Sequence, residues 1–315
     1  MIKTILGPPG CGKTQTNSNL IRDCIEDGID PDRIACVSFT RKAAMESKSR
    51  VCNDWGLEED MLPYFRTLHS MAFLAGGYKS AEVMSGKDLK VIGDEIGIAF
   101  GRQKSSDIET DFDQLGQAEG DFYLGLYHRG RSEMLSLEDA YQKHGSHHLH
   151  WSELRRLVDA YENYKRVNGK IDFADMIETF VERQVPLDIE ALFVDEAQDL
   201  STLQWKMVDV LRKTPRIQVF TGDDDQAIMG FQGADVEAFM AATKEKEVLS
   251  QSYRVPQEPW REACNIAARI AGREHKDWRP TSEEGYVQSH QDIWDVPLEE
   301  GNWCIMARTN RIAST

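Results

Sequence analysis

Short apolar runs and longer amphipathic segments alternate along most of the chain. Apolar runs bounded by glycine, proline or polar residues predict strands, and apolar positions spaced three and four residues apart predict helices. The expected strands cover residues 2–6, 34–39, 191–194, 217–221, 247–250 and 303–307. Helices are expected at residues 15–27, 41–52, 202–212 and 256–271, with others ending near residue 76 and beginning after residue 172. Strands that alternate with helices favour an α/β fold, with a parallel sheet and helices on both faces.

Between about residues 78 and 165 the pattern becomes mostly helical. The clearest helices there are at 87–100 and 151–166, and an acidic stretch of low periodicity with several glycines lies between them. We expect this region to be an insertion between strands of the sheet. His144, His147, His148 and His150 lie close together in it, but no carboxylate or cysteine completes a recognisable metal-ligand spacing. A solvated loop before a helix capped by Ser152 is therefore preferred over a metal site.

The composition is that of a soluble globular protein, with 41% hydrophobic and 29% charged residues over 315 positions. The apolar runs fall short of the roughly 20 residues needed to span a membrane, and residues 1–6 lack the pattern of a signal peptide. The six cysteines show no C-x-x-C spacing, so reduced thiols are expected. These features predict a cytoplasmic protein with no membrane partner.

Charge is distributed unevenly along the chain. The formal net charge of −16 argues against a protein that coats nucleic acid non-specifically. Residues 1–50, however, carry eight Lys and Arg against six Asp and Glu, whereas residues 101–140 carry four against nine. A local path for nucleic acid beside an acidic remainder is therefore allowed, although charge alone does not decide it.

Residues 7–14 fit the spacing G-x-x-x-x-G-K-[ST] between a predicted strand and a predicted helix, which is the setting of a phosphate-binding loop. Glycines let backbone N–H groups converge on phosphate oxygens, and the helix N-terminus adds partial positive charge. Lys13 would reach the β- and γ-phosphates, and the Thr14 hydroxyl would bind Mg²⁺. The residues expected to bind the nucleotide are Gly7, Pro8, Pro9, Gly10, Cys11, Gly12, Lys13, Thr14 and Gln15. The alternative is an ordinary glycine turn, but Lys-Thr directly after the second glycine argues against it.

Polar groups also follow later predicted strands. In open α/β sheets ligands bind beyond the carboxyl ends of the strands, so these groups are expected to meet over one nucleotide. Asp195 would hold Mg²⁺, and Glu196 would orient and deprotonate the attacking water. Gln226 suits a γ-phosphate sensor, and Arg254 would neutralise charge that develops on the transferred phosphoryl group. Taken alone, the acidic pair also fits a solvated loop, and Gln226 and Arg254 also fit ordinary surface positions.

Seven ordered segments resemble the motifs of UvrD/Rep-like superfamily 1 DNA helicases. They are residues 7–14, 37–44, 67–69, 172–175, 195–199, 222–226 and 251–254. The resemblance implies a RecA-like P-loop NTPase that uses ATP and Mg²⁺ and moves 3′ to 5′ on DNA. It supports the ATPase roles given above and implies that Tyr253 stacks on the nucleotide base. It also implies a single-stranded DNA path that includes Phe39, Thr40, Arg41, His69 and Phe231.

Aromatic platforms with polar and basic groups suit sequence-tolerant strand binding. Core packing is the alternative for Phe39 and Phe231. Two local departures from the family weaken these expectations. No segment ahead of the phosphate loop carries the family's adenine-reading glutamine, which predicts weaker selectivity for ATP over GTP. Where the family has Trp-Arg, this chain has Phe231 and Gln232, and the loss of a cation there predicts weaker binding of single-stranded DNA.

The resemblance also divides the chain. Residues 1–77 and 166–248 would form the first RecA-like motor domain, and residues 78–165 a helical accessory subdomain inserted in it. Residues 249–315 would begin a second RecA-like domain. The later family motifs do not follow in this sequence, so we expect a fragment, or a chain that takes the C-terminal domains from a protein partner.

The leading hypothesis is an ATP-dependent DNA helicase or translocase motor that acts in DNA repair or replication. The alternative is a nucleotide-gated DNA-binding or regulatory protein without unwinding activity. Strand displacement that depends on Lys13 distinguishes the two. A third class, a small-molecule P-loop kinase, would leave residues 222–226 and 253–254 without a role.

Overall fold

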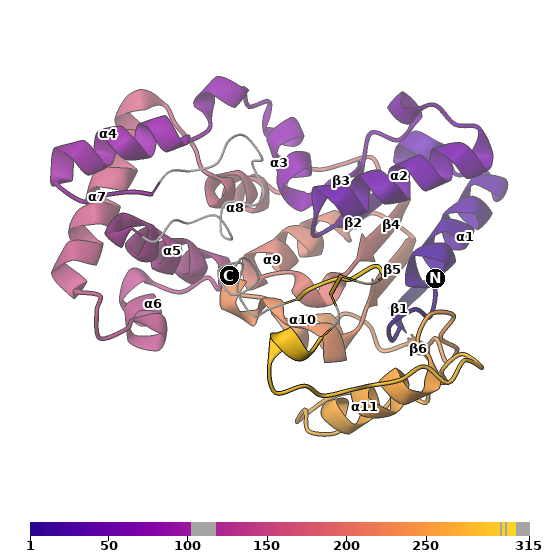
Figure 1. Ribbon diagram of the computed structural model, residues 1–315. Helices are drawn as coiled ribbons and strands as arrows, with labels where there is room; N and C mark the ends of the chain where they lie inside the picture. Colours follow the sequence, from indigo (N-terminus) through magenta and orange to yellow (C-terminus); the bar gives the residue numbers. More distant parts are fainter. Residues whose placement is uncertain (102–117, 297, 300, 307–315) are drawn as a thin grey trace.

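Six parallel strands form one sheet at the centre of the protein (Figure 1). The computed structural model describes residues 1–101, 118–296, 298–299 and 301–306. The strands are β1 (Ile2–Leu6), β2 (Ile34–Ser38), β3 (Phe65–Thr67), β4 (Ala191–Asp195), β5 (Ile217–Gly222) and β6 (Lys246–Val248), in the order β3-β2-β4-β5-β1-β6. Leu6 pairs with both Gly222 and Val248, and Ser38 pairs with Asp195. The carboxyl ends of the central strands therefore lie level at one edge of the sheet.

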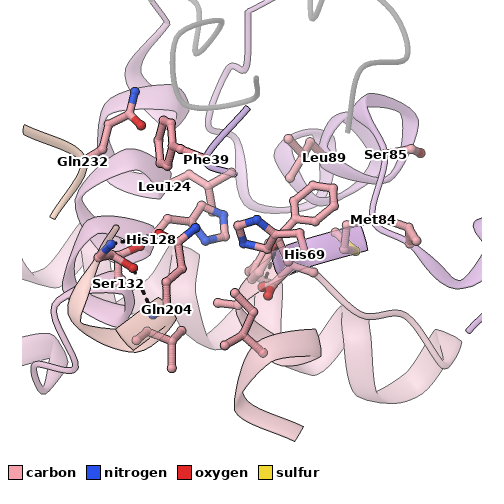
Figure 2. Close-up of a pocket in the computed structure, with 18 of the residues that line it drawn as sticks. Phe39, His69, Met84, Ser85, Leu89, Leu124, His128, Ser132, Gln204 and Gln232 are labelled. Atoms are coloured by element: carbon pink, nitrogen blue, oxygen red, sulfur yellow. Dashed lines mark hydrogen bonds between the residues drawn. The ribbon is translucent and has the colours of Figure 1, made fainter. Parts of the chain in front are cut away.

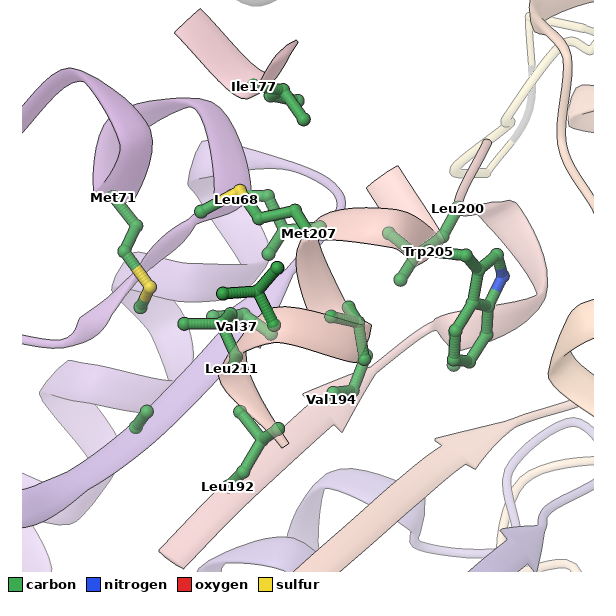
Figure 3. Packing of buried hydrophobic residues seen from close by; sticks show 14 of the residues in the cluster. Val37, Leu68, Met71, Ile177, Leu192, Val194, Leu200, Trp205, Met207 and Leu211 are labelled. Carbon is green, nitrogen blue, oxygen red and sulfur yellow. The ribbon is translucent and has the colours of Figure 1, made fainter. Parts of the chain in front are cut away.

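Both faces of the sheet are covered by helices. Because side chains alternate along a strand, Cys36 points to one face and Val37 to the other. The first face packs against α1 (Lys13–Glu26) and α2 (Arg41–Trp55). The second face packs against α3 (Leu68–Gly76), α8 (Phe173–Arg183), α9 (Thr202–Leu211) and α10 (Val236–Ala241), through the apolar cluster of Figure 3. The predicted α/β fold, a parallel sheet between two helical layers, is confirmed.

Four helices form a group beside the sheet (Figure 1). They are α4 (Gly86–Ile96), α5 (Glu119–Ser132), α6 (Leu137–His144) and α7 (Trp151–Asn168). Leu89, Tyr123 and Leu157 contribute to an apolar core that these helices share. The chain enters and leaves the group side by side, because the N–H of Met84 donates to the carbonyl of Ile171 at 2.8 Å. This group lies between β3 and β4 in the chain.

Some of the predicted elements are wrong. The stretch of low periodicity contains α5 and α6, while residues 102–117 of it lie outside the described part of the chain. The N-cap of α7 is His150, so Ser152 lies inside the first turn and does not cap the helix. The apolar run at 303–306 forms no strand, and residue 307 is not among the described residues.

The histidines of this region are only partly in a solvated loop. His147 and His148 are exposed, as predicted. His144 instead belongs to α6, where its Nε2 lies 2.8 Å from a carboxylate oxygen of Glu133. Within the described residues, no group of three or more His, Cys, Asp or Glu side chains could hold a metal ion.

The chain after β6 passes the carboxyl edge of the sheet and then forms α11 (Gln257–Ala267) on its own side of the molecule (Figure 1). A backbone bridge joins Gln251 to Arg279. The short 3₁₀ helices are η1 (Pro31–Arg33), η2 (Glu59–Met61), η3 (Ser80–Glu82), η4 (Ala197–Asp199), η5 (Asp224–Gln226), η6 (Met229–Gln232) and η7 (Ile293–Asp295). Across the described ranges, no helix has both the length and the apolar character needed to cross a membrane.

Candidate active site

The loop at residues 7–14 joins β1 to α1 and is shaped by its glycines. Gly10 and Gly12 have φ angles of 74° and 81°, in the left-handed region that side chains disfavour. A Cβ on Gly10 would lie 2.5 Å from Cβ of Arg254, and a Cβ on Gly7 would lie 2.2 Å from Cγ of Lys13. The loop therefore packs closely against Lys13 at Gly7 and against Arg254 at Gly10, and it leaves no room for a side chain at either of these two positions.

Lys13 lies where the loop and the acidic strand end meet. Its Nζ donates to the carbonyl of Gly7 at 3.0 Å and lies 3.8 Å from Oε1 of Glu196. The Lys13 side chain is only 11% exposed, whereas that of Glu196 is 37% exposed. The ammonium group of Lys13 is thus held inside the loop, whereas the carboxylate of Glu196 is partly exposed to solvent.

The acidic pair at the end of β4 has two distinct environments. Asp195 is buried, and the pKa of its carboxyl group is raised to about 6, mainly by burial and also by the nearby Glu196, while Lys13 opposes the rise. Glu196 has a φ of 49°, an unusual backbone conformation for a residue other than glycine. Because of this sharp turn, the carboxylate of Asp195 points into the protein and that of Glu196 points into the opening of the site.

Gln198 connects the strand ends of β4 and β5. Its Oε1 accepts the N–H of Asp223 at 3.0 Å. Its Nε2 donates to Oε2 of Glu196 at 2.9 Å and to Oδ2 of Asp199 at 3.2 Å. Gln198 lies within the acidic segment that the sequence singles out, but only its contacts show that it orients Glu196.

Gln226 lies on the same network. It ends η5, and its Nε2 donates to Oδ2 of Asp223 at 2.5 Å. Asp223 in turn joins Gln226 to Gln198 through its backbone N–H. The structure therefore connects Gln226 and Glu196 through two intervening residues.

Residues 252–254 close the opposite side of the loop. The hydroxyl of Ser252 donates to the carbonyl of Pro9 at 2.8 Å, and the N–H of Tyr253 donates to the carbonyl of Gly10 at 2.9 Å. The Tyr253 ring is 77% exposed, and Arg254 is also exposed. The backbone at Tyr253 and Arg254 is thus fixed against the loop, and their side chains face open space.

The residues at this site fit a nucleotide bound with Mg²⁺. The carboxyl group of Asp195 is buried at a strand end and has a raised pKa, so a further cation beside it would stabilise its charged form. Thr14, in the first turn of α1, supplies a hydroxyl close to the loop. Mg²⁺ is commonly bound through one or two protein oxygens together with substrate phosphates, and this donor set is of that kind.

The candidate DNA-binding residues divide into two groups. Phe39 and His69 line a cavity of about 120 Å³ between the sheet domain and the helical group, together with His128 and Gln232 (Figure 2). Thr40 instead caps α2, since its hydroxyl accepts the N–H of Ala43 at 3.2 Å. Arg41 is exposed in the first turn of α2. Phe231 is 54% exposed and lies on η6 beside Gln232.

The cavity has an apolar wall, neutral imidazoles and the carboxyl groups of Asp172 and Asp199. The ring of Phe39 is partly buried against the main apolar cluster and also lines the cavity. Burial lowers the pKa of His69 and of His128 to about 4, so both imidazoles are neutral at pH 7. Figure 2 shows both rings pointing into the cavity. The cavity therefore offers aromatic and hydrogen-bonding surfaces, and its described lining has acidic side chains but no lysine or arginine.

A loop with P-loop spacing after β1, an acidic strand end and a parallel sheet are features of the P-loop α/β class of proteins. Residues 3–247 match the model of the UvrD/REP helicase N-terminal domain, and the chain belongs to this family. It is 28% identical to YjcD of Bacillus subtilis over 247 residues, which cover 73% of this chain and 31% of YjcD.

Two relatives are named ATP-dependent DNA helicase PcrA. The protein from Staphylococcus epidermidis is 26% identical over 270 residues, covering 79% of this chain and 36% of the relative. The protein from Staphylococcus aureus is 24% identical over 279 residues, covering 80% of this chain and 37% of the relative. The chain thus spans about a third of the length of these curated relatives.

Proposed function

We propose that this chain is the ATP-hydrolysing part of a DNA helicase or translocase, and that it binds single-stranded DNA and supports movement 3′ to 5′. Membership of the family and the names of the PcrA relatives support DNA-dependent use of ATP. Single-stranded DNA as the ligand and the polarity come from the ordered motifs. Translocation requires domains that close and open around the nucleotide, so unwinding is a property proposed for the complete assembly.

The single observation that carries the proposal is the approach of Lys13 to Glu196, 3.8 Å between Nζ and Oε1. In the proposed reaction, backbone N–H groups of residues 7–14 and Lys13 bind the β- and γ-phosphates. Thr14 and Asp195 would hold Mg²⁺, which neutralises phosphate charge when it is bound. Lys13, at the start of α1, and Glu196, just after β4, then approach the same terminal phosphate from two different segments of the chain.

The remaining roles follow from where each side chain lies. Glu196 accepts a proton from the attacking water, because one of its oxygens is held by Gln198 and the other remains near the opening. Gln226 contacts the terminal phosphate or the water. Arg254 neutralises charge on the transferred group, and the exposed ring of Tyr253 stacks on the base.

The direct test is Lys13→Ala. Because Lys13 supplies the charge inside the loop, we expect phosphate release from ATP in the presence of single-stranded DNA to fall by about 10²-fold or more. The matched control is Lys206→Ala, which removes an exposed lysine on α9 and should leave the rate within about twofold. Unchanged turnover in Lys13→Ala would remove this loop from catalysis. Lys13-dependent strand displacement would support the motor, and DNA binding without displacement would support a regulatory protein.

A further inference from the structure

A buried lysine from the segment after α11 contacts the acidic end of β5. The side chain of Lys276 is 0% exposed. Its Nζ lies 3.1 Å from Oδ1 of Asp223, 2.5 Å from Oδ1 of Asp224 and 2.8 Å from Oδ2 of Asp225. Three consecutive carboxylates thus converge on one ammonium group, which none of the seven motif segments includes.

The same segment adds two more contacts. Arg273 donates from Nε to Oδ1 of Asp225 at 2.7 Å and from Nη2 to Oδ2 at 2.5 Å. The N–H of Glu274 donates to Oδ2 of Asp224 at 2.8 Å. Residues 273–276 therefore hold residues 223–225 through both side-chain and backbone donors. We call these two segments together the aspartate clamp.

The electrostatics of the aspartate clamp depend on Lys276. Burial lowers the pKa of Lys276, but its three carboxylate partners raise it more, so the net shift is upward and the ammonium stays charged. Burial raises the pKa of Asp225, and the hydrogen bonds from Arg273 and Lys276 reverse this, so the net shift is downward. Without Lys276, three adjacent carboxylates would repel one another, and Arg273 would neutralise Asp225 alone among them.

The aspartate clamp connects directly to the proposed catalytic groups. Asp223, which Lys276 contacts, accepts from Nε2 of Gln226 at 2.5 Å. The N–H of Asp223 donates to Gln198, and Gln198 donates to Oε2 of Glu196 at 2.9 Å. A continuous series of contacts thus runs from Lys276 to both the candidate phosphate sensor and the candidate base.

We propose that Lys276, assisted by Arg273, is a positioning residue for ATP hydrolysis. It holds residues 223–225 in the arrangement that aims Gln226 and, through Gln198, Glu196 at the terminal phosphate. This inference rests on the proposed function for its catalytic consequence, although the contacts exist without it. Residues 273–276 lie beyond the part of the chain matched by the family model, residues 3–247. A shift of this later segment would therefore change the geometry of the hydrolytic groups without touching the phosphate-binding loop.

The test uses Lys276→Met, which removes the charge and retains most of the buried stem. Because the nucleotide-binding loop is untouched, we expect KM for ATP to change by less than about threefold and kcat to fall by about 10- to 100-fold. The matched control is Lys246→Met, which breaks a more exposed pair with Glu274 and should leave both constants within about twofold. Adding Asp224→Asn to Lys276→Met should recover at least about fivefold in kcat, because it removes one of the carboxylates left unpaired.

A second measurement keeps the inference testable without turnover. Hydrogen exchange at the amides of residues 223–226 and 196–199 should rise at least about tenfold in Lys276→Met and stay unchanged in Lys246→Met. Unchanged exchange there, or an unchanged kcat, would overturn the inference. Should Lys276→Met fail to fold, Arg273→Gln is the alternative variant, because Arg273 is the more exposed of the two cations that contact Asp225. It should lower kcat severalfold at constant KM. A wild-type kcat in Arg273→Gln would overturn the inference. A wild-type protein that does not hydrolyse ATP contradicts the proposed function, and exchange at 223–226 still decides whether Lys276 orders this segment.

Discussion

At the scale of single residues, His128 shows how a neutral imidazole is placed among charged groups. It lies on α5, where its ring meets the Tyr161 ring edge-on with centroids 5.7 Å apart. Burial lowers its pKa to about 4; Asp172 opposes this, while Arg131 and Lys165 add to it. The protonated ring would lie beside two cations, so the folded protein disfavours proton uptake at this position.

This gives a pH-dependent effect on stability. The unfolded chain takes up a proton on His128 near pH 6.5, whereas the folded protein does so only near pH 4, so acidification between these values lowers the free energy of unfolding. His128→Gln should remove this contribution. We expect the difference in unfolding free energy, variant minus wild type, to rise as pH falls from 6.5 to 4, by up to about 1.4 kcal/mol per pH unit.

Urea denaturation across this pH range measures the difference directly. Other groups also titrate there, Asp195 among them, but they are common to both proteins and cancel in the comparison. A difference that does not vary with pH would show that His128 has an ordinary pKa in the folded protein.

The sequence indicates which strand-end residues come together at the site, but not the residues that hold them in position by hydrogen bonds and ion pairs. Lys13, Asp195 and Glu196 could be predicted to meet because each follows a strand of one parallel sheet. Gln198 and Lys276 could not, since a hydrogen bond to a backbone N–H or a buried ion pair depends on tertiary positions that leave no local pattern. Lys276 lies about 50 residues from its partners along the chain, and a lysine in a polar segment is more often a surface residue.

At the scale of elements, the glycines of α5 explain why the sequence does not predict this helix. In a sequence, glycines at such intervals are typical of turns and loops. In the structure, a Cβ on Gly130 would lie 2.5 Å from Cβ of Ala140 on α6, and a Cβ on Gly120 would lie 2.8 Å from the carbonyl of Ala99. These glycines permit close packing of the helix, so their role is tertiary. The strand predicted at 303–307 is the reverse case. Residues 303–306 have the composition of a strand, but no described strand pairs with them.

A cluster of ion pairs joins α5 to α8, one of the helices that cover the sheet. Arg131 donates to Asp172 at 2.9 Å, to Asp175 at 2.8 Å and to Glu178 at 2.5 Å, all at or near the start of α8. Lys165 of α7 also donates to Asp172, at 2.9 Å. The helical group is therefore attached to α8 by buried, charge-assisted hydrogen bonds as well as by its chain connections.

Arg131→Met should destabilise the protein strongly. Removing one partner leaves the carboxylate of Asp172 buried with Lys165 as its remaining cation, and breaking a buried pair in this way costs about 3–5 kcal/mol. Arg155→Met is the matched control, because Arg155 lies exposed on α7 and 4.0 Å from the exposed Asp159; it should change stability by less than about 0.5 kcal/mol. Urea denaturation followed by circular dichroism compares the two variants, and equal midpoints would contradict the proposed attachment.

At the scale of the whole molecule, a net charge of −16 requires any DNA path to be local. The candidate path includes the cavity of Figure 2, which Gln232 lines and which carries few cations. Because most of the affinity for nucleic acid comes from phosphate neutralisation, an acidic protein whose cavity is lined by two aspartates should bind single strands weakly. Added salt should weaken that binding less steeply than it does for basic proteins.

Gln232→Arg tests where the strand passes. If Gln232 borders the path, the new cation should tighten binding of a labelled oligothymidine severalfold in low salt and steepen the logarithmic dependence on salt by about 0.7. Gln142→Arg adds the same charge at an exposed position on α6 and should have little effect. Fluorescence anisotropy at several salt concentrations measures both slopes, and equal slopes for the two variants would place Gln232 outside the DNA path.

The order of the strands also constrains how the protein is made. Ile5 of β1 pairs with Thr221 of β5 on one side and with Glu247 of β6 on the other. β1 therefore stays unpaired along both edges until β5 and β6, which follow much later in the chain, have been synthesised, and such distant pairing slows folding. In the meantime the nascent chain exposes an apolar strand, and exposed apolar strands favour aggregation. The phosphate-binding loop, which follows β1 directly, therefore acquires its final surroundings late in folding.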